Sequence, residues 1–125
     1  MGEQENRQTL QDFWKLVQDK NWEAANELIH DDYVQEWPQS GERIRGKHNA
    51  MEINRNYPGF PTMTEKRTLV CGDLGFQEVT LDYDGKIYQG VSLYEFKDGK
   101  VWKETDYFTE PFEAPAWRSQ WVERM

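Results

Sequence analysis

The chain has 125 residues and carries 23 Asp and Glu against 15 Lys and Arg, a formal net charge of -8. This charge repels nucleic-acid phosphates and anionic lipids, and no apolar run approaches the ~20 residues that span a bilayer. We therefore expect neither nucleic acid nor a membrane as a partner, and one compact domain over residues 1–125. The single cysteine, Cys71, cannot form an internal disulfide, and the polar N-terminus lacks an apolar signal segment. Both observations favour a reducing, cytoplasmic setting.

Helical patterns come first along the chain. Four apolar residues recur at the spacing of one helix face and predict a helix over residues 6–20: Leu10, Phe13, Trp14 and Val17. Asn21 can cap a second, short helix that ends before Asp31. A third helix is predicted over residues 47–56, where Pro58 and Gly59 end it.

Extended patterns dominate the rest of the chain. Residues 33–37 alternate as a strand up to Pro38, and four more strands are predicted over residues 65–72, 76–83, 86–97 and 100–109. Asp-Gly pairs at 84–85 and 98–99 indicate tight hairpins, so these strands form an antiparallel meander. The expected fold is α+β, with three N-terminal helices packed on a strongly curved, mainly antiparallel sheet. Such a cone-shaped roll would enclose a cleft.

The last predicted strand carries the most informative pattern. Strict alternation places four residues on one face: Trp102, Glu104, Asp106 and Phe108. Two acids between two large aromatics weaken an apolar face, and such conflicts often mark functional sites. We therefore interpret this strand as the wall of a small-molecule pocket. Same-face neighbours lie roughly 6–7 Å apart, so burial and mutual repulsion would raise the pKa of both acids.

Our hypothesis is that Asp106 acts as a catalytic acid or base, with Glu104 tuning it or binding substrate. An alternative is that these acids are structural and pair with Arg43, Arg45 or Arg67. Further residues are predicted to face the same cleft and contact a ligand: Gln35 and Trp37 and, as hydroxyl donors on one face of the neighbouring strand, Tyr88, Ser92 and Tyr94. No spacing typical of metal ligands occurs, so we expect no metal site, and the two histidines are expected to be solvated or capping residues.

After the first two helices come a strand at 31–38, Asp-Asp-Tyr-Val-Gln-Glu-Trp-Pro, and a segment at 41–46, Gly-Glu-Arg-Ile-Arg-Gly. The third helix and the meander follow. This order resembles the SnoaL-like family of the nuclear transport factor 2-like superfamily. The resemblance covers essentially the whole chain. It implies the α+β roll and, since this superfamily usually dimerises through its open sheet face, a homodimer. Because the superfamily contains cyclases, isomerases, epoxide hydrolases and binding proteins, the fold alone does not set a function.

The resemblance extends to single residues. In this resemblance, the general base of ketosteroid isomerases falls at Trp37, their oxyanion-binding Tyr at Phe13 and their second acid near Ser92. Because none of these three residues can play the corresponding part, the resemblance argues against ketosteroid isomerase chemistry. It also implies that Phe13 lies at the cleft. Asp106 begins an Asp-Tyr-Phe run similar to that of limonene epoxide hydrolases, whose arginine is absent here. In polyketide cyclases of this kind a pocket Asp is the acid or base, a role that Asp106 could fill.

Two classes of function remain open from the sequence. The first is a cofactor-free cyclase, isomerase or hydratase that acts on a small, mostly apolar molecule. The second is a ligand-binding or protein-interaction module that keeps the cleft without catalysis. Trp117 and Trp121 lie in a C-terminal tail beyond Pro115, and we expect them either to cover the cleft or to pack into a partner subunit.

Overall fold

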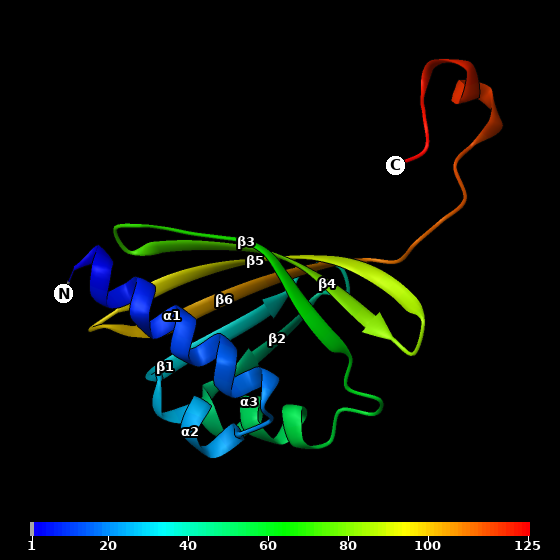
Figure 1. The fold of residues 1–125 in the computed structure, drawn as a ribbon. Coiled ribbons are helices and arrows are strands. Elements are labelled where there is room, and N and C mark those ends of the chain that lie inside the picture. The colour runs from blue at the N-terminus through cyan, green and yellow to red at the C-terminus, as the bar shows by residue number, and fades with distance from the viewer. Residues whose placement is uncertain (1) are drawn as a thin grey trace.

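A curved six-stranded sheet with helices on one face forms the body of the protein, as seen in the computed structural model, which describes residues 2–125 (Figure 1). The strand order across the sheet is β2-β1-β6-β5-β4-β3. The strands are β1 (Ile29–Trp37), β2 (Glu42–Arg45), β3 (Thr62–Cys71), β4 (Leu74–Tyr83), β5 (Lys86–Lys97) and β6 (Lys100–Thr109). All neighbours are antiparallel except β1 and β6, which are parallel. The α+β prediction is confirmed.

Three α-helices cover the concave face: α1 (Glu3–Gln18), α2 (Trp22–Glu27) and α3 (Gly46–Arg55). None of the helices within residues 2–125 is long and apolar enough to cross a membrane. The second helix ends earlier than the sequence predicts, because Ile29 pairs with Val101 of β6 and joins the sheet. The amide of Val101 donates to the carbonyl of Leu28 at 3.0 Å, which fixes this junction.

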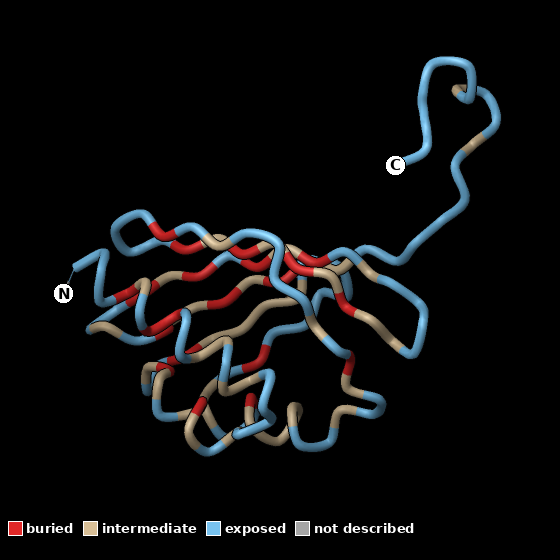
Figure 2. The backbone as a smooth tube through the Cα atoms, in the orientation of Figure 1, coloured by how far each residue is buried: buried red, intermediate tan, exposed pale blue. Residues whose placement is uncertain are grey.

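The core lies between the helices and the sheet (Figure 2). Leu10 of α1 and Val101 of β6 are both 0% exposed and sit at its centre. Two polar side chains of α1 secure the helix to turns of the sheet. The amide of Asn6 donates to the carbonyl of Gly72 at 2.9 Å, and the hydroxyl of Thr9 donates to the carbonyl of Gly99 at 2.8 Å. These bonds hold α1 over the sheet face that the cleft occupies.

A β-bulge near the start of β6 overturns one sequence prediction. Glu95 of β5 pairs with Lys103, but the next residue, Phe96, pairs with Val101, so Trp102 is the extra residue. Val101 takes the inward position. Trp102 is absent from the residues that line the cleft, and the Lys97 ammonium lies 5.3 Å from its ring centre. The prediction that Trp102 faces the cleft was wrong because a bulge breaks strict alternation.

The C-terminal tail, residues 110–125, leaves the sheet after β6 and contains a short 3-10 helix, η1 (Ala116–Trp121). In Figure 1 the tail rises away from the body, on the side of the sheet opposite the helices. Phe112, Trp117 and Trp121 are 80%, 72% and 72% exposed. The tail therefore does not cover the cleft in this structure, and its role in a partner contact stays a prediction.

Candidate functional site

A cleft of about 390 Å³ lies between the three helices and the inner face of the sheet. Ten of its lining residues are aromatic, and they come from the helices, from β1, β4, β5 and β6, and from the segment after α3. Among the described residues that line it, the only charged side chains are Glu104 and Asp106. The cleft therefore combines a mostly apolar wall with one acidic spot, as the alternation in the last strand predicted.

Asp106 is 2% exposed and accepts hydrogen bonds from three neutral side chains. Its Oδ2 accepts from the Gln35 amide at 2.7 Å and from the Trp37 indole N–H at 2.9 Å. Its Oδ1 accepts from the Ser92 hydroxyl at 2.5 Å. Two neighbouring strands supply these donors, since β1 runs parallel to β6 and Ser92 of β5 pairs directly with Asp106. Three donors stabilise a negative charge on this carboxylate.

Glu104 is the second buried acid, with 8% of its surface exposed. Its Oε1 accepts from the Tyr33 hydroxyl at 3.1 Å, and its Oε2 accepts from the Gln35 amide at 3.2 Å. Burial, followed by the negative charge of Asp106, raises the pKa of Glu104 well above its usual range. The site therefore favours the neutral, protonated form of the Glu104 carboxyl.

Arginine does not neutralise these acids. Among residues 2–125, no Lys, Arg or His forms an ion pair with Glu104 or Asp106. Arg43 pairs instead with Glu36 at 2.7 Å, and Arg67 pairs with Glu78 at 3.2 Å. The alternative that an arginine pairs with the two acids is therefore wrong, and their charge is held by neutral donors alone.

Two buried tyrosines complete the polar network: Tyr94, which shares the predicted face of Ser92, and Tyr33, which the sequence analysis did not place in the site. Burial, reinforced by the charges of Glu104 and Asp106, raises the pKa of both Tyr33 and Tyr94 well above the usual value, so both remain protonated donors. The Tyr94 hydroxyl donates to Oε1 of Gln77 at 3.1 Å. Tyr33 shares the inward parity of Gln35 on β1, and that signal could have identified it.

Comparison with known proteins agrees with this architecture. The profile of the SnoaL-like domain matches residues 10–104. The chain belongs to the SnoaL-like domain family. A search among curated proteins returns no match to this SnoaL-like domain.

Solved structures support the same assignment. An NTF-2 like protein of unknown function from Burkholderia xenovorans LB400 is 38% identical, with a TM-score of 0.85 over 98% of this chain and 97% of that chain. A ketosteroid isomerase-like protein from Kribbella flavida is 30% identical, with a TM-score of 0.92 over 98% and 91% of the two chains. An LEH-like epoxide hydrolase from M. tuberculosis is 23% identical, with a TM-score of 0.69 over 85% and 84%, and shares the fold.

Most residues predicted to face the cleft of this SnoaL-like domain line it: Phe13, Gln35, Trp37, Ser92, Glu104, Asp106 and Phe108. Tyr88 does not. It lies on the inward side of β5 near the strand start, and its ring packs on Tyr83 with centres 4.9 Å apart. Tyr83 itself borders the cleft. The sequence thus placed Tyr88 on the correct face of β5, the face of Ser92. It did not take into account that Tyr88 lies four residues along the strand from Ser92.

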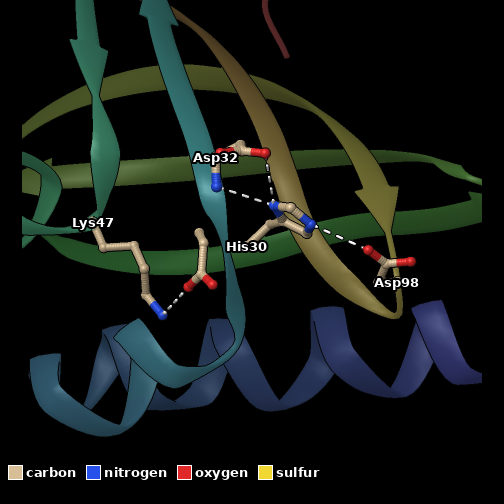
Figure 3. A network of polar contacts seen from close by, with 5 residues as sticks. His30, Asp32, Lys47 and Asp98 are labelled. Atoms are coloured by element: carbon tan, nitrogen blue, oxygen red, sulfur yellow. Dashed lines mark hydrogen bonds and ion pairs between the residues drawn. The ribbon is translucent and has the colours of Figure 1, made fainter.

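His30 of this SnoaL-like domain belongs to a surface network outside the cleft (Figure 3). The Asp32 amide donates to its Nδ1 at 3.0 Å, and its Nε2 lies 3.2 Å from a carboxylate oxygen of Asp98. Nearby, the Lys47 ammonium lies 3.5 Å from Asp31. His30 therefore connects the start of β1 to the β5–β6 turn. Within residues 2–125, His, Cys, Asp and Glu form no group of three that could hold a metal.

Proposed function

We propose that this SnoaL-like protein is a cofactor-independent acid–base enzyme, an isomerase, cyclase, hydratase or hydrolase, for a small and mostly apolar substrate. The observation that carries the proposal is the acid pair in the aromatic cleft, in which Asp106 accepts three hydrogen bonds and burial beside Asp106 raises the pKa of Glu104. Two neighbouring carboxyl groups in different protonation states can divide the roles of base and acid. The isomerase-like and epoxide hydrolase neighbours support this general class.

The hydrogen bonds suggest which atoms would react. Oδ2 of Asp106 accepts two donors, whereas Oδ1 accepts only the Ser92 hydroxyl and keeps a lone pair for a substrate proton. In this proposal Oδ1 of Asp106 is the base and the carboxyl of Glu104 is the acid. Gln35 donates to both carboxyl groups and keeps them oriented toward each other. Gln35, Trp37 and Ser92 are therefore positioning residues.

A panel of three neutral compounds tests the proposal: styrene oxide, a β,γ-unsaturated ketone and cumyl alcohol. The wild-type protein should convert at least one of them, and Asp106→Asn should lower kcat by about 100-fold or more, because a positioned base contributes this much. Glu36→Gln, which changes an acid paired with Arg43 outside the cleft, is the matched control and should leave kcat unchanged.

Two results would contradict catalysis. If the wild-type protein bound a compound of the panel but formed no product, the chain would be a binding module. If Asp106→Asn turned over as fast as the wild type, Asp106 would not be the base. Thermal unfolding of each variant should accompany the kinetics, so that loss of folding is not mistaken for loss of the base.

We also propose that two copies of the chain associate through the outer face of the sheet. Four apolar residues there, the outer patch, are 40% to 61% exposed: Leu69, Leu74, Leu93 and Tyr107. The aromatic tail of the same chain is more exposed still and rises on this side of the sheet, where in this proposal it covers the patch of a second copy. The cytoplasmic setting expected from the sequence stays a prediction.

Light scattering tests this association. We expect the full chain to give about twice the 15.0 kDa of one copy, and removal of residues 110–125 to shift the mass toward a single copy. Leu93→Lys in the outer patch should have the same effect, whereas Glu27→Lys, exposed on α2 on the helix-covered side of the sheet, should not. A full-length protein with the mass of a single copy would overturn the proposal.

A further inference from the structure

The cleft presents negative charge to a ligand and no compensating positive charge. Of the described residues that line it, none is Lys, Arg or His. We call the part of the lining formed by the two buried acids, Glu104 and Asp106, the floor of the cleft. Every donor to Asp106 is neutral. Charges interact strongly where water is excluded, so this site disfavours a carboxylate or phosphate on the ligand and favours positive charge.

The hydrogen-bond donors beside the acids are already committed to them. Tyr33, Gln35, Trp37 and Ser92 all direct their donor groups to Glu104 or Asp106. An enzyme that forms an enolate needs free donors aimed at the developing oxyanion. None of these four is free, so the carboxyl of Glu104 is the one group beside them that can donate a proton to a substrate oxygen.

The walls are suited to the opposite charge. Phe13, Trp14, Trp37 and Phe108 are among the aromatic side chains that surround the floor. Aromatic rings attract cations over their faces, and more strongly so where water is excluded. An ionised Asp106 and several aromatic rings would therefore stabilise a carbocation-like centre that forms between them.

We infer that the reaction proceeds through positive charge on the substrate, and that the substrate class is a tertiary benzylic or allylic alcohol that is dehydrated to an alkene. This inference rests on the proposed function, because it uses the same acid and base. A tertiary alcohol beside an aromatic ring or a double bond forms a comparatively stable cation once its C–O bond breaks. The apolar cleft accepts such a neutral molecule without a charged anchor.

The two acids balance the reaction without a co-reactant. Glu104 gives its proton to the hydroxyl oxygen, and the C–O bond breaks with both electrons on oxygen, so water leaves. Asp106 then removes a proton from the neighbouring carbon, and the electrons of that C–H bond form the double bond. Asp106 now holds one proton and Glu104 none. Transfer of this proton from Asp106 to Glu104 restores the starting pair.

A ligand series with one skeleton and three charges tests the inference by calorimetry. The compounds are cumylamine, which is an ammonium ion at neutral pH, cumyl alcohol and α,α-dimethylphenylacetate. We expect the ammonium ion to bind at least about tenfold more tightly than the alcohol, and the carboxylate to bind at least about tenfold more weakly. Equal affinities, or tighter binding of the carboxylate, would overturn the inference.

Variants separate charge recognition from proton transfer. Glu104→Gln should keep the preference for cumylamine, because Asp106 remains, but should lose conversion of cumyl alcohol to α-methylstyrene by at least about 100-fold. The double variant with Asp106→Asn should lose the preference as well. Glu36→Gln should retain both properties. The wild-type ligand series decides the question even if the double variant does not fold.

Failure of this inference differs from failure of the proposed function. Isomerisation of the unsaturated ketone by the wild type, with no dehydration of cumyl alcohol and no preference for the ammonium ion, would refute cationic chemistry but leave the acid–base enzyme standing. No conversion of any compound would refute both. Dehydration of cumyl alcohol together with tight binding of cumylamine would support both.

Discussion

Glu104→Gln should make the protein more stable as the pH rises, relative to the wild type. Because the pKa of Glu104 is raised in the folded state, folding takes up a proton whenever the unfolded Glu104 is ionised. The stabilising contribution of this carboxyl is therefore complete below its unfolded pKa of about 4.3 and is lost as the pH rises through the folded pKa. Gln is neutral at every pH and lacks this dependence.

One proton per molecule corresponds to a slope of about 1.4 kcal/mol per pH unit in the free energy of unfolding. While the folded Glu104 stays protonated, the difference between variant and wild type should thus grow by about 2.7 kcal/mol between pH 5 and pH 7. Urea unfolding at pH 5, 6, 7 and 8, at constant ionic strength, measures this difference, with tryptophan fluorescence as the signal.

Glu36→Gln serves as the control, because the pKa of Glu36 is shifted in the opposite direction to that of Glu104. Hydrogen bonds from Arg43 and Lys103 lower the pKa of Glu36, so its contribution is lost only as the pH falls below the usual range of a glutamate. Its effect should therefore be constant from pH 5 to pH 8. If the difference between Glu104→Gln and the wild type were equally constant, Glu104 would be ionised in the folded protein and our account of the acid pair would fail.

Two further substitutions test how the cleft is built. Trp37→Phe removes the indole donor to Asp106 while keeping an aromatic ring, and should lower the free energy of unfolding by about 2 kcal/mol in urea titrations. Trp102→Phe, at the bulge outside the cleft, should change it by less than about 1 kcal/mol, and equal effects would contradict the assigned orientations. Gly90→Ala places a methyl group 2.7 Å from Cδ1 of Leu81, so we expect a loss of about 1–3 kcal/mol in the same assay. An unchanged stability would mean that the Leu81 side chain moves aside at little cost.

Local chemistry in the sequence predicted the meander well. Asp84 and Asp98 both have positive φ, of 56° and 54°, and each is followed by a glycine that also has positive φ, as tight hairpin turns require. The inward positions of Glu104 and Asp106 followed from alternation, because both lie beyond the bulge. Trp102 was misplaced since a bulge changes the parity of a strand without any sequence rule that marks its position.

The sequence did not predict that three hydrogen-bond donors converge on Asp106. Gln35 and Trp37 lie about seventy residues before Asp106, and only the parallel pairing of β1 with β6 brings them together. No local pattern specifies which strands pair or in which register. For the same reason the sequence did not exclude an arginine partner for the two acids. In the structure, the partners of both acids are neutral donors.

The position of β6 in the sheet has a consequence for biosynthesis. This last strand of the chain lies between β1 and β5, so it joins the β2–β1 pair to the β5–β4–β3 sheet. On the ribosome, both parts emerge before the strand that connects them, and a product that terminates before residue 100 contains neither that strand nor the two acids. Synthesis therefore completes the sheet and the acid pair together, when the last strand emerges.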